Sequence, residues 1–367
     1  MTGKGLPTPT LNELYVYVTN GCNCACRHCW IVPEDSGNAN RPVHFIDPQV
    51  FAAAVEEAIP LGLNAIKWTG GEPTIHPDFD KLLGIQKEYG LGGRIETNGM
   101  QVTAELAQLL KKCGVTGVSV SLDGASAATH DAIRNVPGGF DRTLTGIDHL
   151  VTAGYRPGII MSLMQINISE LETLLDLAVE IGAGDVKLNI VQPTLRGAAL
   201  HESGDDLSIE AILKLNQRLL NELQPRYELP IFLDVPMAFR PLGRLVDGDG
   251  LSSCGILGLL GLLADGHYAL CGVGEHVPDL VYGQAGVGRL AELWAWHPLL
   301  QELREGLPKK LQGVCGHCLM KKVCLGSCVA MNYQRGQGLM APYWFCEQAY
   351  AENLFPETRL NVKPGMA

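Results

Sequence analysis

The sequence predicts an α/β fold in which a partial six-stranded barrel of β/α units, of the TIM type, is followed by a small irregular cysteine-rich domain. Two observations predict it. Over the first 200 residues, short apolar runs alternate with segments whose apolar residues recur every three or four positions, which is typical of parallel strands joined by helices. Beyond residue 250 the chain instead becomes rich in glycine and cysteine. The expected divisions are a barrel over residues 1–200, a bridging region over 201–250, and a cysteine-rich domain with a C-terminal tail over 251–367.

Short apolar or β-branched runs mark the strands that follow the first cysteine-rich loop. Because strand side chains alternate between two faces, Ser119 and Ser121 share one face of their strand. Parallel sheets of this kind bind ligands at the carboxyl ends of their strands. The expected strands are Ala65–Thr69, Arg94–Thr97, Val118–Leu122, Gly158–Met164 and Val186–Ile190, with a further apolar strand at Ile231–Val235.

Helices are expected between these strands, where apolar residues recur at helical spacing. Such helices provide the right-handed crossovers that consecutive parallel strands need. The expected helices are Pro48–Ile59, Asp78–Tyr89, Thr103–Cys113, Phe140–Ala153, Ser169–Ile181 and, before the cysteine-rich part, Ser208–Leu223.

The loop Gly21–Trp30 holds four of the twelve cysteines, and three of them are spaced as metal ligands. A 4Fe-4S cluster normally takes four thiolates, so Cys22, Cys26 and Cys29 would leave one iron open to a ligand from outside the protein. Half of a zinc site, a redox pair and a set of buried thiols are the alternative interpretations of this loop. Cys24 has no assigned role, and Cys113, at a helix end, is expected in the core.

The second expected strand runs directly into Gly70-Gly71-Glu72-Pro73. Glycines after a strand let the backbone approach a ligand, and the Glu72 carboxylate can accept hydrogen bonds from an ammonium group. Taken alone, such a tetrapeptide is more often a glycine turn followed by proline. Its place on the strand after the cysteine loop favours ligand binding, since both segments then lie at the carboxyl ends of neighbouring strands.

With these residues in view, the chain resembles the radical S-adenosylmethionine (radical SAM) superfamily. The resemblance rests on three residues between Cys22 and Cys26, two between Cys26 and Cys29, His28 just before the last cysteine, and the Gly-Gly-Glu-Pro segment. It implies that the methionine end of S-adenosylmethionine chelates the open iron.

The resemblance also implies a set of contacts to this cofactor. Glu72 would meet its amino group, Asn98 a ribose hydroxyl, and Leu195 the adenine, while Ser121 and Arg134 are the candidates for its carboxylate. The implied cofactor-binding residues are His28, Gly70, Gly71, Glu72, Pro73, Asn98, Ser121, Arg134 and Leu195.

Seven cysteines in the last third of the chain follow an ordered spacing that resembles the SPASM domain, an auxiliary cluster-binding extension of radical SAM enzymes that modify peptides and proteins. A zinc ribbon built from four of them is the alternative, but it leaves the other three unexplained. The resemblance implies one 4Fe-4S cluster on Cys315, Cys318, Cys324 and Cys346, and another on Cys254, Cys271 and Cys328, which makes three clusters with the first loop. The second auxiliary cluster is one cysteine short, so either another side chain or the substrate completes it.

Composition limits the partners of the protein. The formal charge of −11 and the pI of about 5.4, without a basic run, argue against nucleic acid. The segment Met1–Thr10 lacks a signal pattern, and Ile256–Ala264 is apolar but too short to span a bilayer, so a cytoplasmic location without membrane attachment is expected. In a reducing compartment, clustered cysteines are more often metal ligands than disulfides.

The resemblance implies an oxidoreductase that cleaves S-adenosylmethionine to a 5′-deoxyadenosyl radical and takes a hydrogen from a ribosomally made peptide, for an oxidative crosslink or related maturation. About a dozen residues precede the first strand, so a separate leader-peptide-binding protein, or direct recognition by the barrel, is implied. An electron donor such as flavodoxin or ferredoxin is a further expected partner.

Three other functions stay open. An anaerobic sulfatase-maturating enzyme is disfavoured because its family carries an aspartate where Gly272 stands, and an eighth cysteine that is missing here. Oxidation of a small-molecule cofactor precursor is the second. An iron-sulfur electron carrier would need neither the open iron nor the Gly-Gly-Glu-Pro segment.

Overall fold

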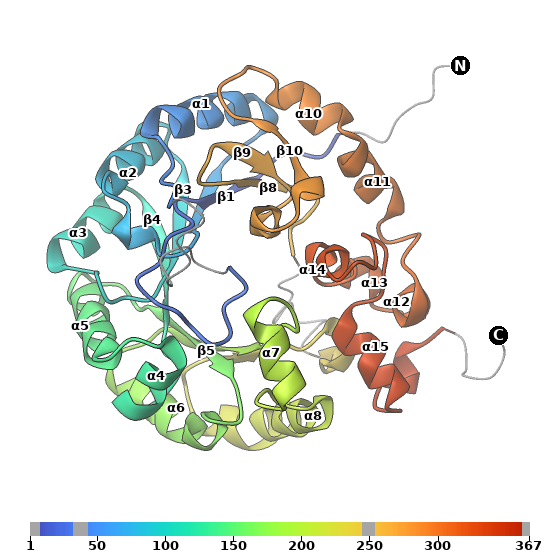
Figure 1. The fold of residues 1–367 in the computed structure, drawn as a ribbon. Helices are drawn as coiled ribbons and strands as arrows, with labels where there is room; N and C mark the ends of the chain where they lie inside the picture. Colours follow the sequence, from blue (N-terminus) through green and yellow to red (C-terminus); the bar gives the residue numbers. More distant parts are fainter. Residues whose placement is uncertain (1–7, 32–42, 244–253, 362–367) are drawn as a thin grey trace, which may run out of the picture.

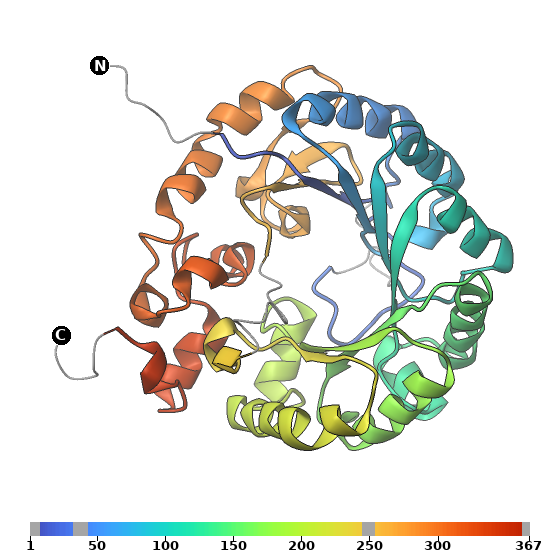
Figure 2. The same cartoon turned by 180° about the vertical axis from the view of Figure 1, so that it is seen from behind.

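The computed structural model describes residues 8–31, 43–243 and 254–361. Its strands form one curved sheet in the order β10-β9-β8-β1-β2-β3-β4-β5-β6-β7, with helices around its outer side (Figures 1 and 2). From β1 to β7, every strand is parallel to its neighbours. This confirms the α/β barrel fold. The strands are β1 Glu13–Tyr17, β2 Ala65–Thr69, β3 Gly92–Thr97, β4 Val115–Ser121, β5 Gly158–Leu163, β6 Asp185–Ile190 and β7 Ile231–Leu233.

Five of the six expected helices begin and end within two residues of their expected bounds, and the sixth, expected over Ser208–Leu223, ends as an α-helix at Arg218. Local signals fix their first turns: the hydroxyl of Thr103 accepts from the Leu106 N–H at 3.2 Å, and that of Ser126 from the Thr129 N–H at 3.3 Å. The second of these caps α4, a helix that the sequence pattern did not predict. The helices are α1 Pro48–Ala58, α2 Phe79–Glu88, α3 Ala104–Lys112, α4 Ala127–Arg134, α5 Gly139–Thr152, α6 Leu171–Glu180, α7 Arg196–Ser203 and α8 Ile209–Arg218, the last continued by a π-helical turn at Leu219–Leu223.

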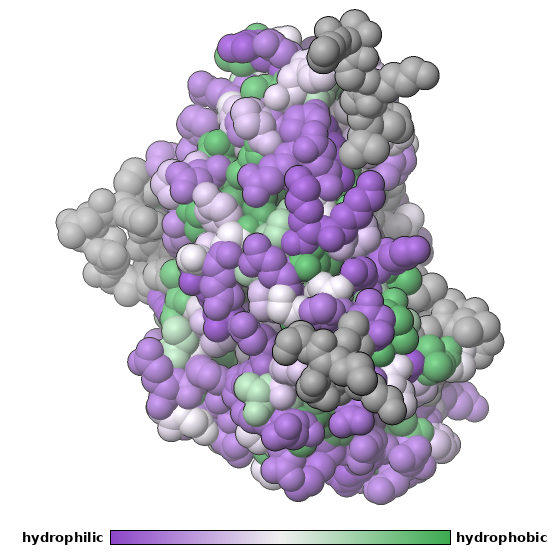
Figure 3. Space-filling view, turned by 90° about the vertical axis from the view of Figure 1, so that its right-hand side faces the viewer, coloured by the Kyte–Doolittle hydropathy of each residue, from purple (hydrophilic) through white to green (hydrophobic). Residues whose placement is uncertain are grey.

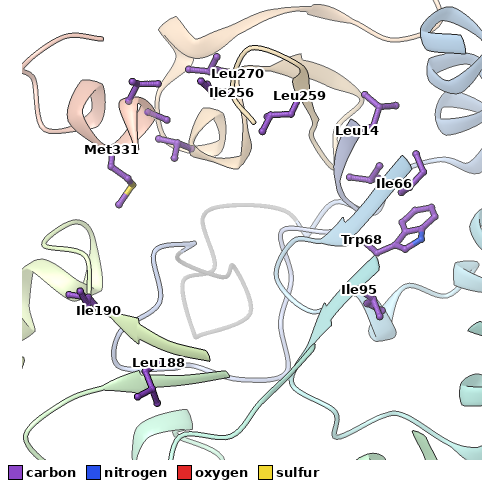
Figure 4. Packing of buried hydrophobic residues seen from close by; sticks show 14 of the residues in the cluster. Leu14, Ile66, Trp68, Ile95, Leu188, Ile190, Ile256, Leu259, Leu270 and Met331 are labelled. Atoms are coloured by element: carbon purple, nitrogen blue, oxygen red, sulfur yellow. The ribbon is translucent and has the colours of Figure 1, made fainter. Parts of the chain in front are cut away.

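Apolar and polar side chains alternate along the barrel strands. Trp68 of β2 is fully buried on the helix side, where its ring packs against Phe51 of α1 and Phe79 of α2. Figure 4 shows this outer layer, with Leu14, Ile66, Trp68 and Ile95 on neighbouring strands. The positions between them face the lumen and are only half-buried, among them Tyr15, Lys67, Glu96, Ser119, Ser121, Lys187 and Asn189.

The cysteine-rich part extends the same sheet. Strand β8 (Leu259–Leu262) pairs in parallel with β1, with Glu13 opposite Leu259, and β9 (His267–Ala269) and β10 (Val281–Gln284) follow as antiparallel neighbours. The apolar run at Ile256–Ala264 therefore lies in the core, as expected, and so does Cys113. The remaining helices are α10 Leu290–Trp296, α11 Pro298–Gly306, α12 Gly313–His317, α13 Lys321–Cys324, α14 Val329–Gln334 and α15 Trp344–Ala351.

The C-terminal helices present a mixed surface in which hydrophilic and hydrophobic residues are interspersed (Figure 3). In the described ranges, no helix is both long and apolar enough to cross a bilayer.

Candidate functional site

The first cysteine loop follows β1 and is held by main-chain hydrogen bonds to the Gly-Gly-Glu-Pro turn that follows β2. The Gly71 N–H donates to the Thr19 carbonyl at 2.8 Å, and the Glu72 N–H donates to the Gly21 carbonyl at 3.0 Å. A Cβ built on Gly71 would overlap the Gly21 carbonyl, and one built on Gly70, whose φ is +124°, would press on the Thr19 carbonyl. Both glycines are therefore required by the contact between the two loops, before any ligand is considered.

Two of the three expected cluster ligands, Cys26 and Cys29, lie in different surroundings. Those of Cys26 stabilise a negative charge, and those of Cys29 limit its exposure to solvent. The Cys26 thiol is 6% exposed and accepts from the Arg134 guanidinium at 3.5 Å. A hydrogen bond from Cys24 and the charge of Arg134 together outweigh burial and lower the pKa of Cys26. Burial raises the pKa of Cys29 to about 12. A bound cation would have to offset that shift, because the thiolate is the form that ligates metal.

Cys24, to which the sequence assigned no role, lies between two of the ligands. Its thiol is 4% exposed and hydrogen bonds to the sulfurs of Cys22 and Cys26 raise its pKa, which favours the neutral thiol. A neutral thiol is a donor, so Cys24 can donate to the more acidic Cys26. Its own sulfur accepts from the Asn98 amide at 3.5 Å.

A buried ion pair supports the loop from the barrel side. Asp123 follows β4 and is fully buried, and its Oδ2 lies 2.8 Å from Arg134 Nε and 3.9 Å from His28 Nε2. Its Oδ1 accepts from the Ser162 N–H at 2.7 Å. Although burial acts to raise it, the guanidinium of Arg134 holds the pKa of Asp123 below its usual range.

One polar atom of this group, His28 Nδ1, is buried and has no hydrogen-bond partner among the described residues, whereas Asp123 Oδ2 and Arg134 Nε face each other in the ion pair. Buried polar groups are normally hydrogen-bonded, so His28 Nδ1 is available to a polar ligand beside the cysteine loop. The residues present thus fit a charged cofactor at this place. Arg134 is already paired with Asp123, so its expected contact with the cofactor carboxylate would have to use its other N–H groups, and that contact stays a prediction.

Glu72 is occupied by the protein itself. Its Oε1 accepts from the Thr97 hydroxyl at 2.6 Å and from the hydroxyl and N–H of Thr74 at 2.7 and 3.1 Å, and its Oε2 accepts from the Asn98 N–H at 2.7 Å. These donors use all of the roughly four lone-pair directions of a carboxylate. Because they come from both segments, Glu72 links the turn after β2 to the end of β3. Its expected contact with the cofactor amino group stays a prediction, and it would displace or share one of these donors.

The remaining expected cofactor residues differ in their contacts with the described residues around them. The Asn98 amide donates to Asn23 Oδ1 at 2.6 Å. Leu195 has a φ of 51° and a ψ of −124° at the start of α7, and Arg196 beside it donates to the Cys26 carbonyl at 3.2 Å. Pro73 is buried, and the Ser121 hydroxyl makes no hydrogen bond within the described ranges.

Four of the C-terminal cysteines line one pocket with otherwise mostly apolar walls. They are the four that the resemblance to the SPASM domain assigns to one auxiliary cluster: Cys315, Cys318, Cys324 and Cys346. Their convergence from α12, α13 and α15 suits a group that binds several thiolates in a dry site.

The other auxiliary set is also brought together. Burial raises the pKa of Cys271, and the sulfurs of Cys328 and Cys254 raise it further, as neighbouring negative charges do. Asp234, after β7, is a further acidic group near Cys328. In the parts of the chain described, no group of three or more His, Cys, Asp or Glu side chains is close enough to hold a single metal ion. The thiolates of an iron-sulfur cluster bind different irons and need not converge in this way.

Several contributors to the site escaped the sequence analysis. The Asp123–Arg134 pair joins the end of a strand to an unexpected helix, and the donors to Glu72 come from three segments. Tyr17, whose ring packs against Trp30 of the cysteine loop, ends β1 within an apolar run that gives no signal of its own.

Comparison with known proteins agrees with this site. Residues 16–178 match the model of the radical SAM superfamily. The AdoMet-dependent heme synthase of Methanosarcina barkeri is 30% identical over 336 residues, which cover 86% of this chain and 90% of that protein. The mycofactocin maturase MftC of Mycobacterium tuberculosis H37Rv is 28% identical over 369 residues, which cover 98% and 88%.

Two solved structures share the fold across nearly the whole chain. Streptococcus suis SuiB bound to the precursor peptide SuiA has a TM-score of 0.71 at 16% identity, covering 93% of this chain and 76% of SuiB. Native anSMEcpe with bound AdoMet and the Kp18Cys peptide has a TM-score of 0.71 at 18% identity, covering 94% and 96%. Together with the cysteine loop and its supporting turn, these matches show that the chain belongs to the radical SAM superfamily.

Proposed function

We propose that this enzyme cleaves S-adenosylmethionine reductively and takes a hydrogen atom from a ribosomally made peptide, as a step in peptide maturation such as an oxidative crosslink. When bound, a 4Fe-4S cluster and S-adenosylmethionine would supply a 5′-deoxyadenosyl radical, with methionine as the other product and the electron coming from an external donor. Cys22, Cys26 and Cys29 would hold the cluster. The finer parts of the proposal include two auxiliary 4Fe-4S clusters, an external flavodoxin- or ferredoxin-type donor, and a cytoplasmic location.

The protein's own contribution is to position the cofactor and the substrate and to exclude water from the reacting atoms. The turn after β2 fixes the cysteine loop through the main chain, so the open coordination site would point in one direction. The buried Asp123–Arg134 pair keeps a fixed positive group beside Cys26, which favours its thiolate. The reacting atoms would then lie at the carboxyl ends of the strands, above the lumen.

The observation that favours a peptide is the polarity of the lumen. Barrel interiors are usually packed with bulky branched residues. Here Lys67 Nζ pairs with Glu96 Oε1 at 2.8 Å, and the Lys67 ammonium lies 4.9 Å from the ring centre of Tyr15. Half-buried charges and hydroxyls can pair along the whole length of a peptide with its amides and side chains, whereas in a porphyrin only the propionate groups, and not the flat apolar face, can use them. The match to a maturase along 98% of the chain supports the same proposal.

A heme precursor is the second candidate substrate, and a specific observation favours it. The heme synthase of Methanosarcina barkeri shares slightly more identity with this chain than the maturase does, also over most of its length. The two candidates share the cofactor chemistry and differ only in what the lumen admits.

The deciding experiment is anaerobic. Reconstituted enzyme, S-adenosylmethionine and reductant are incubated either with short peptides encoded beside the gene or with Fe-coproporphyrin III. Release of 5′-deoxyadenosine with loss of two hydrogen masses from a peptide would support the peptide proposal. Conversion of the porphyrin with every peptide unchanged would establish the second candidate instead. Absence of 5′-deoxyadenosine in all reactions would refute the radical chemistry, with Cys26→Ala as the inactive reference.

A further inference from the structure

One tyrosine packs between two of the cysteine sites. Tyr17 ends β1 and is 4% exposed. On one side its ring meets the ring of Trp30 edge-on, with centroids 6.2 Å apart and planes at 84°, and Trp30 directly follows Cys29. On the other side its phenol group covers Gly272, which directly follows Cys271, so closely that a Cβ on Gly272 would overlap the phenol carbon and oxygen. Tyr17 therefore sets the spacing of the two loops.

The phenol oxygen is a polar atom in apolar surroundings. Tyr17 packs in a small cluster with Ile31, Leu263 and Ala269. Burial raises the pKa of Tyr17 well above its usual range, so the group is neutral and keeps its proton at physiological pH. The phenol oxygen lies against the Gly272 backbone, whose effect on the pKa opposes that of burial and is smaller. No oxygen or nitrogen of the described residues accepts the phenol proton, which leaves this proton for an acceptor beside Cys271.

We propose that Tyr17 is a positioning residue that fixes the distance between the two loops and donates its phenol proton to sulfur of the iron-sulfur group held by Cys254, Cys271 and Cys328. The inference rests on the proposed function, since it needs these cysteines to hold such a group. A hydrogen bond to sulfur stabilises the charge that reduction adds, so it raises the reduction potential of the group.

The test uses Tyr17→Phe, which keeps the ring and removes the donor. The reference protein and the Tyr17→Phe variant both carry alanine at Cys22, Cys26 and Cys29, so that only the auxiliary centres are observed. Each protein is titrated anaerobically with reductant, and the reduction of its centres is followed by EPR. Loss of the hydrogen bond should lower the equilibrium constant for one-electron reduction of the centre on Cys254, Cys271 and Cys328 about tenfold. The midpoint potential of that centre then becomes about 59 mV more negative. The other auxiliary centre should be unchanged.

Two further variants separate a local effect from general damage. Tyr155→Phe removes another buried phenol, which donates to the Val115 carbonyl at 2.8 Å far from the auxiliary sites, and it should shift neither midpoint. Gly272→Ala displaces the Tyr17 ring and should shift the same midpoint in the same direction even if Tyr17→Phe folds poorly. Unchanged midpoints in a folded Tyr17→Phe, equal shifts of both centres, or, where Tyr17→Phe does not fold, unchanged midpoints in Gly272→Ala would overturn the inference.

The same titration distinguishes this inference from the proposed function. If the protein with intact auxiliary cysteines binds no iron beyond background and gives no auxiliary signal, the proposed cofactors fail, and the inference fails with them. If the auxiliary signals are present and Tyr17→Phe leaves their midpoints unchanged, only the inference fails.

Discussion

At the residue scale, the site depends on close main-chain contacts and on one buried ion pair rather than on exposed polar side chains. Glycine is needed at position 71 because the carbonyl of Gly21 occupies the space of a side chain. Sequence reasoning identified this glycine as a position of close approach, but attributed the approach to a ligand. The neighbouring loop that makes the contact lies about 50 residues earlier in the chain, so no local pattern could reveal it.

Gly71→Ala should therefore displace the cysteine loop and lower the iron bound to it. The measurement is iron and sulfide content after reconstitution, compared in a background without the auxiliary cysteines. Gly84→Ala is the matched control, because a Cβ there meets nothing within 4 Å and the residue lies inside α2. Alanine in a helix should stabilise that variant by about 0.5–1 kcal/mol. Full iron loading of Gly71→Ala would contradict the role given to the contact.

Asp123→Asn should leave the guanidinium of Arg134 buried without its counter-charge. We expect a loss of about 3–5 kcal/mol in the free energy of unfolding, measured by denaturant titration of the protein without metal. The native pKa of Asp123 is lowered, so its contribution is present at neutral pH and is lost as the pH falls below about 4. The wild type should lose more stability than Asp123→Asn over that acidic range, and parallel pH profiles would argue against the pair.

At the element scale, the strands and helices of the barrel follow from local patterns, and the connections do not. Strand β2 was predicted with its observed bounds, because apolar residues and a glycine turn delimit it. Helix α7 was missed, since its start depends on Leu195 in a conformation that a leucine side chain rarely adopts. Strand β8 was expected only as apolar core, because pairing with β1 is a contact between distant parts of the chain.

The conformation of Leu195 gives a prediction for the connection between β6 and α7. A positive φ at a residue with a Cβ costs about 1–2 kcal/mol, and glycine avoids this cost. Leu195→Gly should therefore unfold at higher denaturant concentration than Leu195→Ala, which keeps the strain and also loses the side chain. If Leu195 contacts the adenine as expected, both variants should bind S-adenosylmethionine more weakly, as isothermal calorimetry would report. Equal stability of the two variants would show that the backbone relaxes there.

At the scale of the whole molecule, the cysteine-rich part and the barrel share one sheet and one core. Leu14 of β1 and Leu259 of β8 belong to the same buried cluster as Trp344 of α15. The division at residue 250 drawn from composition therefore describes a change in sequence character within a continuous sheet. Amino-acid composition describes which side chains are present and does not indicate which strands pair.

This continuity predicts cooperative unfolding. Loss of β-sheet and helix signal by circular dichroism should coincide with the change in tryptophan fluorescence, since Trp68 lies in the barrel and Trp344 in the C-terminal part. Trp344→Phe should leave the transition single, with Trp294 and Trp296 of α10 still reporting on the C-terminal part. Two separated transitions would show instead that the two parts unfold independently.

The pairing of β1 with β8 also has a consequence for biosynthesis. During translation, β1 leaves the ribosome long before β8, which follows about 250 residues later in the chain. Until then one edge of β1 has no neighbour, although its strand pattern is apolar enough to attract another chain. In the nascent protein, the edge of β1 therefore stays unpaired until β8 has been synthesised. We expect the yield of folded protein in cells to depend on chaperones that bind this edge before the chain is complete.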